Sequence, residues 1–217
     1  LIEIEKNFIK KKKPKNLTIF HVTGLGAIDK YGLNHLNHNG LVSKVIGGNY
    51  GLQIPFMKNL IVGNKIEAYN FPQGILSQMC RTMASKQPGI ITKVGLNTYM
   101  DPRIEGGKMN KKTKKNLIEL IKIGGQEYLF YKAQKPDVAI IRGTSIDNDG
   151  YVYMDHEATT REDLSIAQAV HNNGGVVICQ FKKFTKKNYT NPHLAKIPAF
   201  LIDYYVHDPM QKQTYVT

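Results

Sequence analysis

The 217-residue sequence contains no tryptophan, only two cysteines and no long apolar run. No run reaches the roughly 18 to 20 apolar residues that a membrane-spanning helix needs, so we expect no membrane as a partner. Cys80 and Cys179 are too few for a disulfide scaffold and lack the spacing of a metal site. These absences favour a reducing, cytoplasmic setting.

Familiar site motifs are missing as well. The sequence has no Walker A motif, no G-x-S-x-G and no H-E-x-x-H. It has no signal peptide, but it begins with Leu1 rather than Met, and we therefore expect its natural N-terminus to be missing. Hydrophobic residues make up 41% and charged residues 22%, a globular balance that excludes wholesale disorder, collagen and coiled coil.

The net charge of +13 is concentrated in three segments. Residues 1–15, 108–122 and 182–196 carry +4, +5 and +5, and the other residues together carry −1. Such segments indicate either a polyanionic partner or lysine-rich surfaces in water. Aromatic residues do not alternate with the lysines, so a surface for stacking nucleic-acid bases lacks support, and we expect no nucleic acid as a partner.

Extended and helical patterns alternate along the chain. The patterns predict helices over residues 1–10, 73–86 and 160–172, the last with a Thr160/Asp163 or Thr159/Glu162 capping box. They predict strands over residues 17–23, 41–46, 65–69, 90–92, 117–123, 127–131, 137–142, 176–180 and 200–206.

This order predicts an α/β fold with an open, mostly parallel sheet flanked by helices. The hairpin-like residues 117–131 add an antiparallel element, which would make the sheet mixed. The chain opens on a helix end followed by a strand, so we expect an earlier strand to be missing. No repeat and no low-complexity linker interrupts residues 1–217, which we interpret as one domain, incomplete at its N-terminus.

Three polar turns follow predicted strands. Thr23-Gly24-Leu25-Gly26 lets backbone amides approach a ligand or simply makes a tight turn, and it fails as a dinucleotide fingerprint. Gln73, in Asn70-Phe71-Pro72-Gln73-Gly74, either faces a ligand at a strand end or caps the following helix. Asp101–Lys108 is a glycine-rich loop that an Asp101–Arg103 pair would brace.

Neither a catalytic carboxylate nor a metal site stands out. Glu105 has no activating partner beside it in the sequence. His35 and His38 are three residues apart, but no third ligand stands at a convincing spacing, so we expect ordinary polar roles for them and no zinc.

Five motifs in order carry a resemblance to a known family. They are Asn16–Ile19 leading to Thr23–Gly26, Tyr69–Gly74, Gln87–Ile90, Asp101–Arg103 with Gly106–Lys108, and Ile166–Gly175. Together they resemble the N-terminal half of family I coenzyme A transferases, most closely the single-chain acetate/propionate type. The resemblance covers essentially the whole chain.

The resemblance implies a short-chain acyl-CoA transferase of short-chain fatty acid metabolism that moves coenzyme A from an acyl-CoA such as acetyl-CoA to another small carboxylate. In such enzymes a glutamate of the second half attacks the acyl-CoA, and a glutamyl-CoA thioester follows. This chain would lack that C-terminal half, so we assign no catalytic residue and expect the chain alone to be inactive.

The resemblance also implies site residues and partners. Gln73 would face the small acid or its oxyanion, and Thr23 and Gly24 would line the same cleft. The Asp101–Lys108 loop would lie beside the active site or at an oligomer contact. Coenzyme A enters as a substrate, no cofactor is needed, and a homo-oligomer is expected.

Two other functions remain open on the sequence. A sugar-phosphate isomerase or deaminase of similar fold would need an acid/base constellation that the sequence does not display. A basic nucleic-acid-binding module would rest on the three lysine segments alone.

Overall fold

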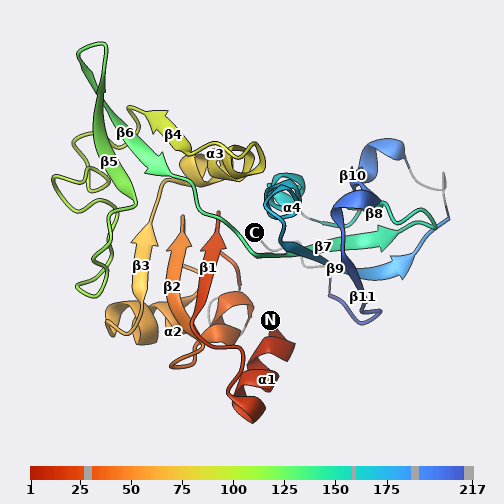
Figure 1. Cartoon of the computed structure of the whole chain (residues 1–217). Coiled ribbons are helices and arrows are strands. Elements are labelled where there is room, and N and C mark those ends of the chain that lie inside the picture. The colour runs from red at the N-terminus through yellow and green to blue at the C-terminus, as the bar shows by residue number, and fades with distance from the viewer. Residues whose placement is uncertain (27–30, 158–159, 187–190, 213–217) are drawn as a thin grey trace. The chain divides into compact units, whose positions relative to one another are not determined.

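The computed structural model describes residues 1–26, 31–157, 160–186 and 191–212 (Figure 1). Contacts divide the chain into two compact units. The first comprises Leu1–Gln78 and Ile90–Lys132, and the second comprises Met79–Gly89 and Ala133–Thr217. Each unit has its own hydrophobic core.

A parallel sheet forms the centre of the first unit. Its strands are β1 (Leu17–His21), β2 (Val42–Gly47) and β3 (Glu67–Asn70), in the order β1-β2-β3. Both pairings are parallel, and His21 lies opposite Gly47, which in turn lies opposite Asn70. The carboxyl ends of all three strands therefore meet at one edge of the sheet.

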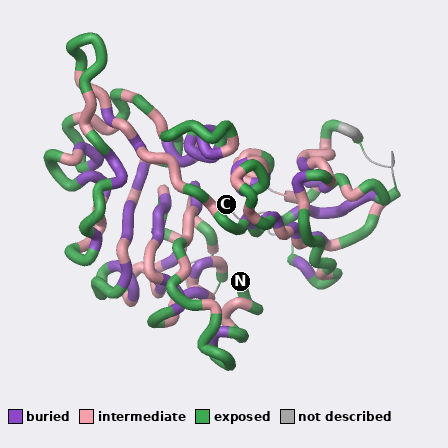
Figure 2. The backbone as a smooth tube through the Cα atoms, in the orientation of Figure 1, coloured by how far each residue is buried: buried purple, intermediate pink, exposed green. Residues whose placement is uncertain are grey.

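Short helices complete the core of this sheet: α1 (Ile2–Lys11), η1 (Gly32–Leu36), α2 (Ile54–Phe56) and η2 (Met57–Val62). Phe8 of α1 and Phe56 of α2 are buried with Val45 of β2 in one cluster. Buried residues lie on central strands such as β2 and on the helices packed against them (Figure 2).

A carboxylate from α1 lies between the two histidines singled out in the sequence. Glu5 accepts hydrogen bonds from His35 Nδ1 and His38 Nε2, both at 2.7 Å. Burial disfavours the charged form of Glu5, but the bonds from His38 and His35 outweigh this and lower its pKa. The described residues contain no group of three or more His, Cys, Asp or Glu side chains suited to a metal ion.

An antiparallel hairpin follows in the chain. Strands β5 (Ile118–Ile123) and β6 (Gln126–Lys132) pair antiparallel, and β4 (Gly89–Thr92) completes the sheet in the order β4-β6-β5. Gly124 and Gly125 form the turn with φ of 56° and 79°, a conformation that favours glycine. The hairpin predicted for residues 117–131 is confirmed.

Helix α3 (Gln73–Ala84) crosses the boundary between the units, which falls after Gln78. The residues at helical spacing, Leu76, Met79, Cys80 and Met83, are all buried. In the second unit, Asn172 Nδ2 donates to the Ala84 carbonyl at 2.8 Å and Asn173 Nδ2 donates to the Met83 carbonyl at 3.0 Å. The end of α3 is thereby tied to the helix that ends at Asn172.

The second unit contains a five-stranded mixed sheet. Its strands are β7 (Val138–Ile146), β8 (Val152–Tyr153), β9 (Val176–Phe184), β10 (Ala195–Ile197) and β11 (Tyr204–His207), in the order β10-β8-β7-β9-β11. Strands β7, β9 and β11 are parallel, and β8 and β10 are antiparallel to their neighbours. Its helices are α4 (Asp163–Asn172), η3 (Pro192–Leu194) and η4 (Ala199–Leu201).

Several predicted elements differ in their bounds, and two predictions are wrong in kind. Helix α4 begins at Asp163, and its N-cap Glu162 makes no side-chain cap bond, so the Thr160/Asp163 box is wrong; Thr159 lies outside the described residues. The strand predicted for residues 200–206 is split, because Leu201 belongs to η4 and is buried while Asp203 precedes β11. The Asp203 carboxylate accepts a bond from the Val177 amide at 2.7 Å, which fixes the start of β11 beside β9.

The α/β prediction is confirmed, with one sheet wholly parallel and one mixed. Within the described ranges, no helix is both long and apolar enough to span a membrane. Lysines in two of the basic segments lie in water, since Lys10–Lys13 and Lys111, Lys112, Lys114 and Lys115 are exposed.

Candidate functional site

The three strand ends of the first unit are packed closely around Gly48. A Cβ atom added to Gly48 would lie 2.3 Å from the Val22 carbonyl oxygen and 2.6 Å from Gln73 Cγ. No side chain fits in that space, so glycine is required by the approach of its neighbours. The turn after β1, which contains Thr23 and Gly24, and the first residue of α3 therefore border the same glycine.

The predicted site residues differ in exposure. Gln73 is exposed at the start of α3, whereas Thr23 and Gly24 are half-buried after β1. Asn70 ends β3, and with its amide turned to donate it bonds the carbonyls of Gly47 at 3.2 Å and Gly48 at 3.3 Å. The end of β3 thus holds the glycine pair, and the exposed Gln73 side chain lies at the same edge of the sheet.

His21 supports the turn that carries Thr23. Its Nδ1 donates to the Thr23 carbonyl at 2.7 Å, and burial lowers the pKa of the ring, so the imidazole is neutral at pH 7. Its Nε2 packs against Gly47, where a Cβ would lie 2.2 Å away. The ring of Tyr50 meets it edge-on at 5.2 Å, and the Tyr50 hydroxyl donates to the Tyr69 carbonyl at 2.8 Å.

A buried amide lies behind Gly24. Gln53, which precedes α2, is 0% exposed, and neither its Nε2 nor its Oε1 has a hydrogen-bond partner within the part of the chain that is described. Its Nε2 lies 3.4 Å from the position of a Cβ on Gly24. Most buried side-chain amides are hydrogen-bonded, so Gln53 is an exception placed directly at the candidate site.

The Asp101–Lys108 loop supports this edge from the side of β3. The Gly107 carbonyl accepts a bond from the Asn70 amide at 2.9 Å, and the Tyr99 hydroxyl donates to the Asn70 carbonyl at 3.3 Å. Gly107 has a φ of 72° and packs against Phe71. The loop therefore fixes the strand end from which the Pro72-Gln73 turn departs.

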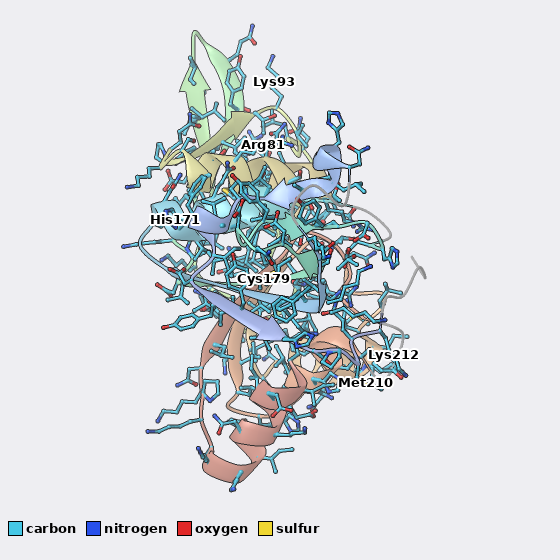
Figure 3. All side chains as sticks on the ribbon, turned by 90° about the vertical axis from the view of Figure 1, so that its right-hand side faces the viewer. Arg81, Lys93, His171, Cys179, Met210 and Lys212 are labelled. Atoms are coloured by element: carbon cyan, nitrogen blue, oxygen red, sulfur yellow. The ribbon has the colours of Figure 1, made fainter. Side chains whose placement is uncertain are left out.

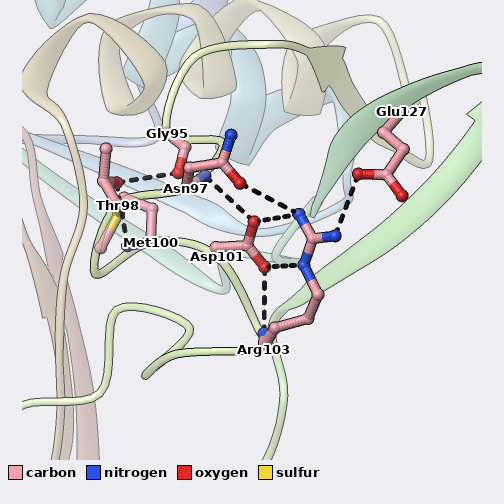
Figure 4. A network of polar contacts seen from close by, with 7 residues as sticks. All are labelled: Gly95, Asn97, Thr98, Met100, Asp101, Arg103 and Glu127. Carbon is pink, nitrogen blue, oxygen red and sulfur yellow. Dashed lines mark hydrogen bonds and ion pairs between the residues drawn. The ribbon is translucent and has the colours of Figure 1, made fainter.

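A buried carboxylate organises the loop itself (Figure 4). Asp101 accepts bonds from Arg103 Nη2 at 2.7 Å, from Arg103 Nε at 2.9 Å and from the Asn97 amide at 3.1 Å. Arg103 also donates to Glu127 at 3.0 Å. The bonds from Arg103 hold the pKa of Asp101 well below its usual range, and the predicted bracing pair is confirmed.

The structure offers no activated nucleophile at this edge among the described residues. Glu105 is exposed in the loop. Burial raises the pKa of both cysteine thiols, Cys80 and Cys179, to about 12, which leaves them protonated and unreactive. Cys179 lies inside β9 among packed side chains (Figure 3).

The sequence predicts Gln73, Thr23 and Gly24 as site residues, and it does not single out Gly48, His21 or Gln53, which the structure places beside them. Gly47-Gly48 follows the strand predicted for residues 41–46. Glycine at such a position often marks a close approach of another part of the backbone, so this pattern could have indicated Gly48. Nothing local distinguishes Gln53 or His21, since their positions depend on tertiary packing.

The strand ends converge on glycines next to the exposed amide of Gln73. This is the carboxyl edge of the sheet, where open α/β proteins usually bind small molecules. The family is shown by comparison: residues 5–208 match the coenzyme A transferase family model. The chain belongs to the coenzyme A transferase family.

Individual relatives agree. The chain is 46% identical over 202 residues to acetate CoA-transferase YdiF of Escherichia coli O157:H7, covering 93% of this chain and 38% of that protein. It is 30% identical to the acetoacetyl-CoA:acetate/butyrate CoA transferase alpha subunit of Clostridium acetobutylicum, covering 90% of this chain and 79% of that subunit.

A solved structure gives the same result. The YdiF acyl-CoA transferase of Escherichia coli O157:H7, solved as a thioester complex with CoA, superposes with a TM-score of 0.93 at 43% identity. The match covers 100% of this chain and 42% of that one. The chain thus spans about two fifths of the length of the acetate CoA-transferase it resembles.

Replacing Asp101 with Asn should destabilise the first unit by about 2 to 3 kcal/mol, because Arg103 loses a buried partner while remaining partly solvated. The native pKa of Asp101 lies below the unfolded value of about 3.9, so the carboxylate stabilises the fold fully above about pH 5. Its contribution is lost as pH falls through the native pKa. Urea unfolding of the wild type and Asp101→Asn between pH 3 and pH 8 measures the difference.

The matched control is Glu105→Gln, an exposed carboxylate in the same loop, which should leave the free energy of unfolding unchanged. Equal stability of the two variants at pH 7 would contradict the bracing role of Asp101.

Proposed function

We propose that the protein carrying this chain is a short-chain acyl-CoA transferase, which moves coenzyme A from an acyl-CoA such as acetyl-CoA to another small carboxylate. Membership of the family and 46% identity to an acetate CoA-transferase support this function over the isomerase and nucleic-acid hypotheses. The observation that carries the proposal is the placement of the exposed Gln73 amide beside Gly48, at the convergent strand ends.

The chemistry balances without a redox or metal cofactor. A glutamate carboxylate attacks the thioester carbonyl, and the C–S bond breaks. Coenzyme A leaves as a thiolate, and the acyl group stays on the glutamate as an acyl-glutamyl anhydride. The thiolate then attacks the glutamyl carbonyl, which releases the first acid and forms a glutamyl thioester. The incoming carboxylate repeats these steps in reverse.

The glutamate belongs to the part of the enzyme outside this chain, so the chain alone should be inactive. The role of this chain is to bind the substrates and to stabilise the negative charge that forms in each attack. An oxyanion forms in each attack. The Gln73 side-chain amide would donate a hydrogen bond to that oxygen or to the substrate carboxylate. Thr23 and the Gly24 backbone would complete the wall of the cleft, in a turn that His21 holds through the Thr23 carbonyl.

The partners follow from the same proposal. Acyl-CoA and small carboxylic acids are the substrates, and the second half, in the same polypeptide or as a separate subunit, completes the site. A homo-oligomer of the whole enzyme is part of the proposal.

Borohydride trapping tests the mechanism. The intact enzyme is incubated with acetyl-CoA and then with sodium borohydride, which reduces a thioester but not a carboxylate. We expect a loss of activity that depends on acetyl-CoA, with a reduced glutamate mapped by mass spectrometry outside residues 1–217. If borohydride causes no acyl-CoA-dependent loss, the covalent mechanism is wrong.

Replacing Gln73 with Ala should lower kcat/KM for acyl transfer by about 100- to 1,000-fold, the usual cost of removing one oxyanion donor. Because Gln73 is exposed, the melting temperature should not change. Steady-state kinetics of the intact enzyme measure the effect. Gln78→Ala, an exposed glutamine of the same helix, is the control, and similar kinetics for both variants would remove Gln73 from the site.

A further inference from the structure

The side-chain amide of Gln53 is not used by the fold around it. The backbone of Gln53 is bonded on both sides, since its N–H donates to the Tyr50 carbonyl at 3.1 Å and its carbonyl accepts from the Met57 amide at 2.8 Å. These bonds fix the residue directly before α2, but its side chain makes no cap bond to that helix. Within the described ranges, neither Nε2 nor Oε1 of this fully buried side chain has a hydrogen-bond partner. A buried amide of this kind usually has a functional reason or a bound partner.

Gly24 leaves room beside this amide. Gly24 is not among the glycines with a positive φ, so its backbone conformation does not require glycine. A Cβ atom at Gly24 would lie 3.4 Å from Gln53 Nε2 and 3.1 Å from Leu52 Cδ1, the end of a flexible side chain. The missing side chain therefore leaves a place for one small group within hydrogen-bonding reach of the amide. Because Gly24 is only half-buried, that place is reached over the turn after β1.

The place beside Gly24 is close to the proposed position of the substrate carboxylate. The Val22 carbonyl and Gln73 both border Gly48, and Val22 is two residues before Gly24. Two residues of extended chain span at most about 7 Å. An acid whose carboxylate meets the Gln73 amide therefore needs only a short carbon chain to place a substituent beside Gly24.

The chemistry of an amide selects the substituent. Gln53 offers a donor at Nε2 and an acceptor at Oε1, and a hydroxyl group pairs with both because it also donates and accepts. An alkyl group would leave both atoms unpaired, and a keto oxygen would leave Oε1 unpaired. A second carboxylate would bury a charge against a neutral group, which is costly. A water molecule has the same two functions as a hydroxyl group, and the experiment below separates the two.

We infer that Gln53 determines the substrate specificity of the transferase by binding a hydroxyl group on the acyl chain, in the space that Gly24 leaves open. The enzyme then prefers a short-chain hydroxy acid to the unsubstituted acid of the same length. This inference rests on the proposed function for the acid itself and adds the substituent that the acid carries.

Acceptor competition in the intact enzyme tests the assignment. Acetyl-CoA is supplied with equal concentrations of an acid and its hydroxy analogue, in the pairs propionate with 2-hydroxypropionate and butyrate with 3-hydroxybutyrate. The product ratio gives the ratio of the two kcat/KM values. The wild type should favour the hydroxy acid by about tenfold or more in at least one pair, because a buried hydrogen-bonding group discriminates against an analogue that leaves it unpaired. The absence of a preference in both pairs overturns the inference.

Gln53→Met removes the amide and keeps the length of the side chain. The preference should fall by about tenfold or more through a higher KM for the hydroxy acid, with kcat/KM for the unsubstituted acid unchanged. The melting temperature should not fall, because no bonded partner is left behind. An unchanged ratio, as expected if the amide binds water alone, overturns the inference, and so does an equal loss for both acids, as expected of a purely structural role. Gln78→Met, the same change at an exposed position of α3, is the control and should keep the wild-type ratio.

Gly24→Ala tests the place of the contact. The added methyl group would occupy the position assigned to the hydroxyl group, so this variant should also lose the preference. Gly74→Ala, in which nothing lies within 4 Å of the added Cβ, should retain it. A preference that Gly24→Ala leaves intact would overturn the inference, because the hydroxyl group would then bind elsewhere.

Thermal unfolding with the acid alone separates this inference from the proposed function. The hydroxy acid should raise the melting temperature of the intact enzyme more than the unsubstituted acid does, because a ligand of the folded state stabilises it, and Gln53→Met should remove the difference. This binding requires no acyl-CoA. A shift that depends on Gln53 in an enzyme without coenzyme A transfer would overturn the proposed function alone. Transfer without a preference for the hydroxy acid would overturn the assignment of Gln53 alone.

Discussion

The candidate site depends on the close approach of three strand ends at Gly47 and Gly48. The His21 ring occupies the space where a side chain of Gly47 would be, and the Val22 carbonyl and Gln73 occupy the space beside Gly48. Two residues without side chains thus let the turn after β1 and the start of α3 reach the same point. The Asn70 amide and the loop that Asp101 organises fix the third strand end.

Two buried polar groups at this edge lower the stability of the fold. Gln53 is fully buried with an amide that has no partner in the described chain, and His21 keeps one ring nitrogen unpaired. Such groups lower stability, and natural proteins tolerate them mainly where function requires it. Both groups lie around Gly24 and Gly47, at the candidate site.

Much of the fold was predictable because it depends on local patterns. The apolar spacing of Leu76, Met79, Cys80 and Met83 predicted α3, and Gly124-Gly125 predicted the hairpin. The position of Gln73 followed from a strand that gives way to a helix. The Asp101–Arg103 pair needed only residues two apart. The ordinary polar roles predicted for His35 and His38 are confirmed, but their partner Glu5 could not be predicted, because it is about thirty positions away and no local signal joins them.

Two local patterns failed as predictions. The Thr160/Asp163 pattern resembled a cap, yet α4 begins at Asp163. Residues 200–206 resembled one strand, yet burial of Leu201 and the bond from the Val177 amide to Asp203 divide them. For residues 200–206, contacts with other elements outweighed the local pattern.

The central claim is that the convergent strand ends at Gly48 form the substrate site, and glycine substitutions in the intact enzyme test it most directly. Gly74 has nothing within 4 Å of an added Cβ, so Gly74→Ala should retain the kcat/KM and melting temperature of the wild type. Gly48→Ala must displace Gln73 or the Val22 carbonyl, and its kcat/KM for acyl transfer should fall about 100-fold or more, as expected when a substrate-positioning group moves by about 1 Å. A folded Gly48→Ala enzyme with the kcat/KM of Gly74→Ala would contradict the account.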